Sequence, residues 1–554
     1  MKFVSLRSKA FARVASAAIA AALIPNAPVA QPQVPKGNTA PFQVVETSVD
    51  EILAAYKSGR LTAHQLTQAY LDRINAYNKQ GPNINAIITL NPHALEDADK
   101  LDAAYRTSGF VGPLHGIPVL VKDEIDVAGF PTTLGSVAFK DYRPTKDSFV
   151  VEKLRKAGAI IMGKTTLGEF ALGDTYGSMF GVTRNPYDPE RNVGGSSGGS
   201  AASVNANFST IALAEETGSS VRRPAGLNGL VGMRPTPGLV SRSGMWDGYP
   251  TEAAQMSPIA RNVTDLAHLL DVMVGYDPED PLTAAGVGKY SGSYMRFLDK
   301  NGLKGARIGI IREALATSSE PQSEDFKKVD AVFEKDIAEL KAAGAIIVDN
   351  IEIPGGWKAS LAKLGGGNGD PGPNDEAMRR YLARNPNSPF KTRADLAKAV
   401  AANPPYPNPP APERRNGTVV WKPLPPPDYA RYGQYIKTRD QLMIAILKVM
   451  ADNGLDAIVH KTVEHQATLI KDGINPPYVD GKGMPSVNTP LRYLAAMTVP
   501  SGFTTDNLPV GITFLGRPYS EPTLLKLGYA YEQATHHRQP PKTTPPLTAS
   551  AAHP

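Results

Sequence analysis

The stretch from Gly194 to Pro224 constrains this 554-residue chain more than any other. It begins with glycines around two serines, the first of which is Ser196, and ends with a second serine pair that includes Ser220. Between the pairs lies an apolar run, Phe208 to Ala214, long enough for one buried strand. Glycine permits positive φ and close approach to a ligand. Two such loops joined by one strand are expected to meet at the same edge of a sheet. Such an arrangement indicates a binding or catalytic site.

Helical and strand patterns alternate along the rest of the chain. Ser48 with Glu51, and Thr62 with Gln65, fit the capping boxes that start helices. Further helices are predicted at 92–105, 150–156, 263–274 and 324–342, and strands at 84–90, 119–121, 159–162 and 307–311. This alternation predicts an α/β fold with a buried, largely parallel sheet.

The first 30 residues have the pattern of a secretory signal peptide. Basic residues up to Arg13 precede an apolar run at 14–24, which is shorter than the ~20 residues of a membrane span. Small residues then lead to Ala30, near which we expect cleavage. A basic amphipathic arm is the alternative. The mature protein is expected to be periplasmic or secreted and to lack a membrane span. The absence of cysteine excludes disulfides, thiol catalysis and cysteine-bound metal.

The remaining sequence divides into a linker at 31–46, one large domain at 47–540 and a tail at 541–554 that we expect to be disordered. An irregular insertion at about 355–430 is rich in glycine and proline. The net charge of +6 is spread among interleaved acids and bases, so nucleic-acid binding has little support. No metal or organic cofactor is expected, because His and Asp residues do not cluster at metal-ligand spacing. The sequence does not indicate an oligomeric state.

Three hypotheses compete for the serine-rich stretch. The first is that glycines and serines only make flexible turns. The second is an α/β-hydrolase nucleophile elbow, since residues 194–198 satisfy G-x-S-x-G. That fold requires a downstream catalytic histidine, yet His268 lies in a periodic helix, and His460 and His465 lie in no recognisable catalytic loop. The third begins with Lys122 at the end of a short apolar strand, where burial lowers the pKa of an amine and makes it a general base.

Four motifs in order resemble the amidase signature family of serine hydrolases. They are GPLHGIPVLVKD at 112–123, GGSSGGSAA leading into E-x-G-x-S-V-R-x-P at 194–224, SPIARNVTDLAHLLDVMVGYDPED at 257–280, and PSGFTTDNLPVGITFLG at 500–516. The resemblance extends from about Val49 to Gln533. It implies a single large α/β domain whose central twisted, mixed sheet is covered by helices on both faces.

The resemblance also implies a Ser–cisSer–Lys triad. Ser220 would be the nucleophile, Ser196 would follow a cis peptide and relay the proton, and Lys122, neutral at rest, would be the base. The backbone N–H groups of residues 217–220 would form the oxyanion hole, and two further residues would support the site. These oxyanion-hole and supporting residues are Thr217, Gly218, Ser219 and Ser220, with Ser197 and Arg222.

The expected function is that of a periplasmic or secreted amidase that hydrolyses a small-molecule amide with water through an acyl-enzyme. Apolar side chains at four positions suggest small apolar or aryl amides, although core packing explains them equally well; these are Met179, Phe180, Trp246 and Tyr249. Carbamates and esters are further substrate classes of the family. The alternatives are a catalytically inactive amide-binding protein and a glutamine-hydrolysing amidotransferase subunit.

Overall fold

The computed structural model describes residues 42–246, 254–289, 292–316, 318–364, 375–407, 428–485 and 494–547. The predicted signal peptide and most of the predicted linker lie outside these residues. Residues 42–554 form one compact unit.

Eleven of the described strands form a single sheet in the order β1-β3-β2-β6-β8-β7-β12-β13-β11-β9-β10. Their bounds are β1 Ile87–Leu90, β2 Pro118–Lys122, β3 Ile160–Thr165, β6 Ile211–Glu216, β7 Val231–Arg234, β8 Gln255–Ala260, β9 Arg307–Ile310, β10 Ile346–Val348, β11 Ala457–Lys461, β12 Ala496–Phe503 and β13 Pro509–Leu515. A separate small pair consists of β4 Tyr176–Gly177 and β5 Gly181–Val182.

The sheet is mixed, so the prediction of a largely parallel sheet is wrong. Parallel pairing joins β2 to β3 and β6, and β9 to β10 and β11. The strands between these groups, β6-β8-β7-β12-β13-β11, all pair antiparallel. Alternating helices and strands predict only local units, whereas β7, β8, β12 and β13 take partners that the local pattern does not specify.

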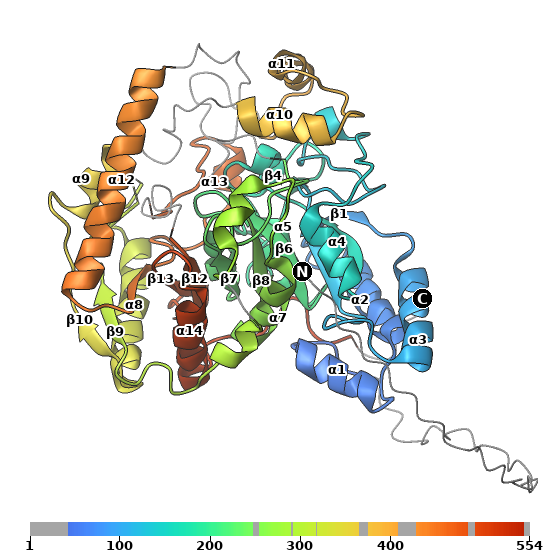
Figure 1. Cartoon of the computed structure of the whole chain (residues 1–554), viewed down its shortest axis with the longest axis horizontal. Helices are drawn as coiled ribbons and strands as arrows, with labels where there is room; N and C mark the ends of the chain where they lie inside the picture. The colour runs from blue at the N-terminus through green and yellow to red at the C-terminus, as the bar shows by residue number, and fades with distance from the viewer. Residues whose placement is uncertain are drawn as a thin grey trace, which may run out of the picture. The chain divides into compact units, whose positions relative to one another are not determined.

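Helices cover the sheet (Figure 1). They are α1 Val49–Lys57, α2 Ala63–Tyr77, α3 Ala94–Ser108, α4 Phe149–Lys156, α5 Gly198–Asn205, α6 Arg222–Leu227, α7 Val263–Met273, α8 Glu324–Ala342, α9 Trp357–Ala362, α10 Asp375–Arg384, α11 Arg393–Ala402, α12 Tyr429–Asp452, α13 Ile470–Ile474 and α14 Glu521–Thr535, with 3-10 turns at Val137–Phe139, Glu169–Ala171, Pro281–Gly286 and Tyr294–Phe297. The capping boxes at Ser48 and Thr62 are confirmed as the starts of α1 and α2.

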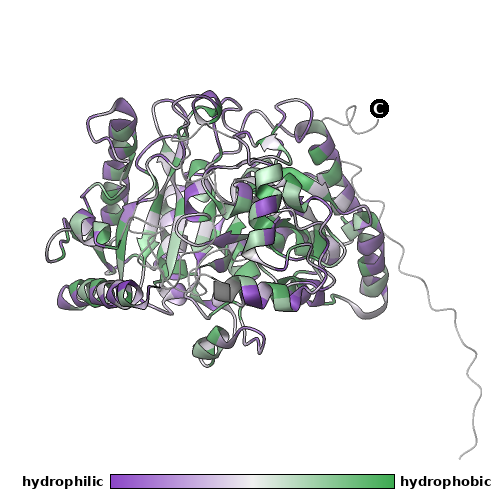
Figure 2. Cartoon of the chain, turned by 90° about the horizontal axis from the view of Figure 1, so that it is seen from above, coloured by the Kyte–Doolittle hydropathy of each residue, from purple (hydrophilic) through white to green (hydrophobic). Residues whose placement is uncertain are grey.

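Alternate residues of β6 serve the two faces of the sheet. Ala212 and Ala214 pack with residues of α5 and α6 in one small apolar cluster. Ile211 and Leu213 belong to the main core, which includes residues of α7 and α14. Successive side chains of a strand point to opposite faces, so helices pack on both sides of the sheet, as expected. The helices show purple and green stripes, as amphipathic covering helices should (Figure 2).

Two expectations about irregular segments need correction. The insertion at 355–430 contains α9, α10, α11 and the start of α12, while its Gly-rich and Pro-rich stretches at 365–374 and 408–427 lie outside the described residues. The tail is ordered as far as residue 547: buried Arg73 donates hydrogen bonds at 2.8 Å to the carbonyl oxygens of Thr544 and Pro545. The sequence of the tail does not reveal that a distant arginine binds its carbonyl groups.

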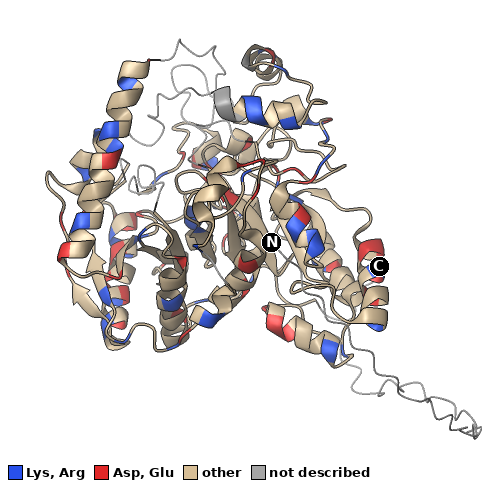
Figure 3. Cartoon of the chain, viewed as in Figure 1, with Lys and Arg blue, Asp and Glu red and all other residues tan. Residues whose placement is uncertain are grey.

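Charges of both signs are interspersed over the outer helices (Figure 3). This agrees with the interleaved sequence pattern and gives no support to a nucleic-acid surface. Within the described part of the chain, every helix is too short or too polar to cross a membrane.

Candidate active site

Two neighbouring parallel strands bring the predicted site residues to one edge of the sheet. β2 pairs with β6 in a register that sets Val121 opposite Leu213. β2 ends at Lys122, and β6 ends at Glu216, just before the second serine pair. The carboxyl ends of parallel strands are where α/β folds place their sites. The lysine and the Ser220 loop therefore share one edge.

Ser196 lies between that lysine and α5. The peptide bond from Gly195 to Ser196 is cis. Lys122 Nζ donates a hydrogen bond to Ser196 Oγ at 2.9 Å, and both side chains are buried. The N–H of Ser197 donates to the Ser220 carbonyl at 3.0 Å and so ties the two serine loops together. The structure thus brings together residues that are 74 positions apart in the sequence.

The glycines of the first serine loop are required by tight packing. A Cβ on Gly195 would lie 2.1 Å from the Gly173 carbonyl oxygen, and one on Gly199 would lie 2.3 Å from the Thr166 carbonyl oxygen. Any side chain at these positions would displace backbone. The loop carrying Ser196 is therefore held against the 166–175 segment.

Ser220 is the accessible member of the constellation. It is partly exposed, whereas Lys122 and Ser196 are buried. Among the described residues, its hydroxyl makes no hydrogen bond, which leaves it available to an incoming carbonyl carbon. A reachable nucleophile with a buried relay and base is the arrangement that nucleophilic catalysis needs.

The loop before α6 offers unused donors. The backbone N–H groups of Thr217, Gly218, Ser219 and Ser220 donate to no acceptor in the described part of the molecule. Arg222 holds the loop by donating to the Gly218 carbonyl at 3.1 Å and pairing with the buried Glu216 carboxylate. Free N–H groups on a fixed loop can stabilise an oxyanion.

Ser197 supports the lysine indirectly. Its hydroxyl donates at 2.9 Å to the carbonyl oxygen of Glu215, and Lys122 Nζ lies 3.4 Å from the same oxygen. Ser219 contacts a distant segment, since its hydroxyl lies 2.6 Å from Met484 Sδ. Met484 thus contacts the loop that carries Ser220.

The surroundings of Lys122 include two carboxyl groups that sequence reasoning missed. Nζ lies 2.8 Å from Glu124 Oε1 and 2.8 Å from Glu215 Oε2. Burial opposes the ammonium form, but the two carboxyls outweigh it and raise the pKa of Lys122 above its ordinary value. The expectation of a neutral resting lysine considered burial alone and did not include these two carboxyls. The sequence did contain a signal for these carboxyls, because residues 124 and 215 are acidic and lie in or next to buried strands.

The structure describes three of the four predicted substrate-pocket residues. Trp246 is buried in an apolar cluster, with its ring 5.5 Å from that of Phe139 and 5.2 Å from that of Tyr381. Its backbone N–H nevertheless donates to the Glu124 carbonyl at 2.9 Å. Met179 and Phe180 form the turn between β4 and β5. Tyr249 lies outside the described residues. Core packing therefore explains the Trp246 ring.

A cavity of about 530 Å³ lies beside Met245, but no triad residue lines it. Two arginines in its wall are already paired, Arg242 with Asp280 and Arg384 with Glu279. This cavity is therefore separate from the chemistry described above.

The histidines named for a hydrolase elbow have other partners. His268 pairs with an aspartate of α1, and His460 and His465 each bond the carbonyl of the next residue. Burial lowers the pKa of His460 to about 3, which keeps it neutral. In the part of the chain that the structure describes, none of them bonds Ser196 or Ser220, so the geometry does not support an elbow triad.

One cluster of potential metal ligands appears that sequence spacing did not predict. Ligand atoms of Asp336, Glu339 and His537 lie within 4.8 Å of one another. His537 Nε2 already pairs with Glu339 at 2.7 Å, and the Tyr531 hydroxyl contacts both carboxylates. These groups satisfy one another, and the geometry gives no independent indication of an ion.

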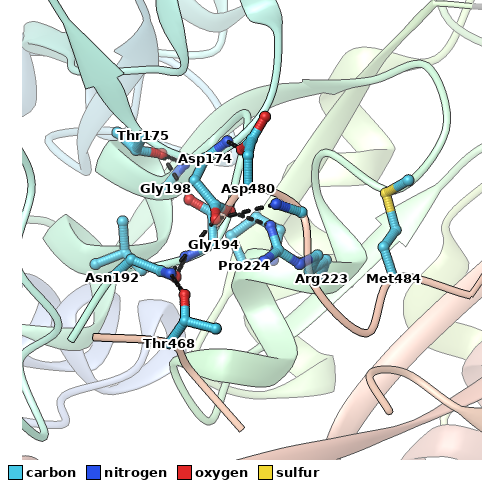
Figure 4. Close-up of polar contacts among 12 residues, drawn as sticks. Asp174, Thr175, Asn192, Gly194, Gly198, Arg223, Pro224, Thr468, Asp480 and Met484 are labelled. Atoms are coloured by element: carbon cyan, nitrogen blue, oxygen red, sulfur yellow. Dashed lines mark hydrogen bonds and ion pairs between the residues drawn. The ribbon is translucent and has the colours of Figure 1, made fainter. Parts of the chain in front are cut away.

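A buried polar network fixes the segment that contacts the Ser220 loop (Figure 4). Arg223 pairs with Asp174, and Asp480 Oδ1 accepts the Asp174 N–H at 2.7 Å. The Asn192 side-chain amide donates hydrogen bonds to the Asp174 carboxylate and to the Thr468 hydroxyl. The segment leading to Met484 is therefore anchored at Asp480 and Gly481 to Asp174.

The geometry can now be compared with known proteins. The profile of the Amidase family matches residues 65–361. A probable amidase of Arabidopsis thaliana is 32% identical over 520 residues, which cover 90% of this chain and 92% of the relative. The chain belongs to the amidase family. It is an amide-hydrolysing enzyme, as expected.

Two further amidase-family relatives are similar over nearly their whole length. The structure of the peptide amidase from Stenotrophomonas maltophilia matches with a TM-score of 0.75 at 32% identity, covering 90% of this chain and 99% of that one. A glutamyl-tRNA(Gln) amidotransferase subunit from Methanosarcina barkeri is 34% identical over 507 residues, 87% of this chain and 96% of the relative. The match to the peptide amidase confirms the predicted α/β architecture.

Proposed function

We propose that this enzyme cleaves C–N amide bonds through an acyl-enzyme on Ser220. The observation that carries the proposal is the 2.9 Å hydrogen bond from Lys122 Nζ to Ser196 Oγ beside the accessible Ser220 loop. Ser220 Oγ attacks the carbonyl carbon, Ser196 relays its proton toward Lys122, and the free N–H groups at 217–220 hold the oxyanion. Reversal of the relay protonates the leaving amine, which amide cleavage requires.

Three substrate classes are candidates, each from a different observation. Small apolar or aryl amides were inferred from aromatic side chains, but the Trp246 ring packs in the core and adds nothing to that inference. Similarity to a peptide amidase favours an amide attached to a peptide-like acyl group. Similarity to an amidotransferase subunit keeps glutamine as the competing substrate. A panel of anilides, alkyl amides, peptide amides, carbamates, esters and glutamine separates these classes by the rate of amine or ammonia release.

The nucleophile is tested with a fluorophosphonate probe, which needs no knowledge of the substrate. We expect the label on Ser220 and its complete loss in Ser220→Ala, with Ser203→Ala as the control, since Ser203 is a buried serine whose hydroxyl donates within α5. Label on Ser196, or no label on a folded protein, would overturn the assignment.

We also propose that the protein is exported, because residues 1–30 have the composition of a secretory signal. Cell fractionation of the full chain, followed by N-terminal sequencing, is expected to give a mature form starting near residue 31 outside the cytoplasm. A full-length cytoplasmic product would contradict export and would favour the amidotransferase alternative.

A further inference from the structure

Two buried glutamates face Lys122 and are not members of the proposed triad. Glu124 Oε1 and Glu215 Oε2 each lie 2.8 Å from Nζ, and the three side chains are exposed by 0%, 3% and 0% for Glu124, Glu215 and Lys122. Nζ donates hydrogen bonds to Ser196 Oγ at 2.9 Å and to Glu215 Oε2 at 2.8 Å, and it lies 3.4 Å from the Glu215 carbonyl oxygen. The lysine is therefore built into its site as a cation.

Neighbouring charges are already occupied with other partners. Asp123 lies 3.1 Å from Lys164, and Glu216 pairs with Arg222. Lys122 is thus the cation that Glu124 and Glu215 face. Two ionised carboxylates would give this buried group a net charge of −1, which is costly in a low-dielectric interior. One proton shared between close carboxyls removes that charge.

Hydrogen bonding indicates where the shared proton resides. Glu215 Oε1 accepts from the Thr217 hydroxyl at 2.7 Å while Oε2 accepts from Lys122, as an anion would. Neither carboxyl oxygen of Glu124 has a hydrogen-bond partner among the described residues. Burial raises the pKa of Glu124 well above its ordinary value; Lys122 opposes this shift and Glu215 adds to it. At rest the group is therefore ammonium, ionised Glu215 and protonated Glu124.

We propose that the proton taken from Ser220 ends on the Glu215 carboxylate, with Ser196 and Lys122 as the path to it. This inference rests on the proposed triad and extends it. Lys122 first passes one ammonium proton to Glu215 Oε2 and becomes a neutral amine. As the Ser220 Oγ–carbon bond forms, the Ser220 proton moves to Ser196, the Ser196 proton moves to the Lys122 amine, and the negative charge ends on the carbonyl oxygen. The reverse transfers deliver the proton to the amine nitrogen as the C–N bond breaks.

The sign of one pH shift distinguishes this relay from a simple lysine base. In the relay, the resting group becomes inactive when it takes up one more proton, because no carboxylate is then left to accept the Lys122 proton. In the double variant Glu124→Gln/Glu215→Gln, the Lys122 amine is the only proton acceptor left in the group. This amine binds a proton more tightly than the wild-type group, in which the ammonium already stabilises the carboxylate. The acid limb of the rate profile should then move upward by about one pH unit or more. If the carboxylates merely held the lysine charged, removing them would move the limb downward.

The test measures the rate of fluorophosphonate labelling of Ser220 against pH for the wild type, both single variants and the double variant. Each single variant keeps one carboxylate, so it is the matched control, and its acid limb should stay in place. A double-variant limb that is unshifted or lower, or single variants that shift as far as the double, would refute the relay while leaving the triad intact. Absence of Ser220 labelling in the wild type would instead refute the proposed function.

Infrared spectroscopy gives a second readout if the double variant does not fold. Other buried carboxyls, such as Asp336, also have raised pKa values, so the readout is the wild-type-minus-variant difference spectrum at neutral pH. It should show the loss of one protonated carboxyl band in Glu124→Gln and in Glu215→Gln alike, because a single carboxyl beside an ammonium is ionised. Persistence of the band in both variants would show that the pair holds no shared proton and would overturn the inference.

Discussion

Lys122 is the residue on which both proposals depend. It contacts Ser196 on one side and two carboxyls on the other. Replacing it with Met keeps much of the apolar stem but breaks the proton path. We expect amidase activity at neutral pH to fall by about 10²- to 10⁴-fold, the usual worth of acid–base catalysis. Ester hydrolysis should fall less, because an alkoxide leaves without the same need for protonation.

The matched control for that variant is Lys461→Met. Lys461 is also buried and ion-paired, at 2.6 Å from Asp330, but it touches no proposed catalytic group. Parallel amide and ester assays of the two variants, with circular dichroism to verify folding, provide the measurement. Equal amidase rates in Lys122→Met and the wild type would rule the lysine out of the proton path.

At the scale of elements, the sequence predicted which strand ends and loops carry the site residues better than it predicted which strands pair with one another. Lys122 was placed at a strand end and Ser196 and Ser220 on loops at one sheet edge, because apolar runs and glycine clusters are local signals. Glu124 was not recognised, since burial of an acid next to a lysine depends on β6 lying beside β2. Strand pairing is non-local, and the same limitation produced the incorrect, largely parallel sheet.

The segment anchored by Asp480 gives a pH-dependent prediction. Burial and the nearby Asp174 carboxylate raise the pKa of Asp480 from 3.8 to about 6. A carboxyl whose folded pKa exceeds its unfolded value favours the folded state at low pH. Its contribution to the free energy of unfolding is complete below about pH 4 and is lost as the pH rises through about 6. The loss is of order 3 kcal/mol by linkage.

Asp480→Asn isolates this effect. The amide oxygen can still accept the Asp174 N–H, now at 2.7 Å from Asp480 Oδ1, but carries no charge. We expect the variant to be more stable than the wild type at pH 7, with the difference shrinking toward pH 4. Urea unfolding at a series of pH values measures it. A variant that is destabilised equally at pH 4 and pH 7 would show that ionisation of Asp480 is not what costs stability.

For the whole molecule, the C-terminal segment acts as a strap that reaches back to the first helices. Arg73 of α2 donates to the carbonyls of Thr544 and Pro545, and the Tyr77 hydroxyl donates to Pro545 at 3.0 Å. The same arginine bonds the Ala206 and Asn207 carbonyls after α5. The C-terminal segment of the described chain therefore lies against the helix that carries Arg73, next to the turn that follows α5.

Two truncations test the strap. Ending the chain after residue 540 removes both carbonyls and leaves buried guanidinium N–H groups without acceptors, at a cost of about 1–3 kcal/mol in the free energy of unfolding. Ending it after residue 547 removes none of the contacts with Arg73 and serves as the control. We expect a lower Tm for the shorter chain only. Because Arg73 also braces the end of α5, whose start follows Ser196, the shorter chain should lose amidase activity at a lower temperature as well. Identical Tm values for the two truncated chains would show that the segment is dispensable for stability.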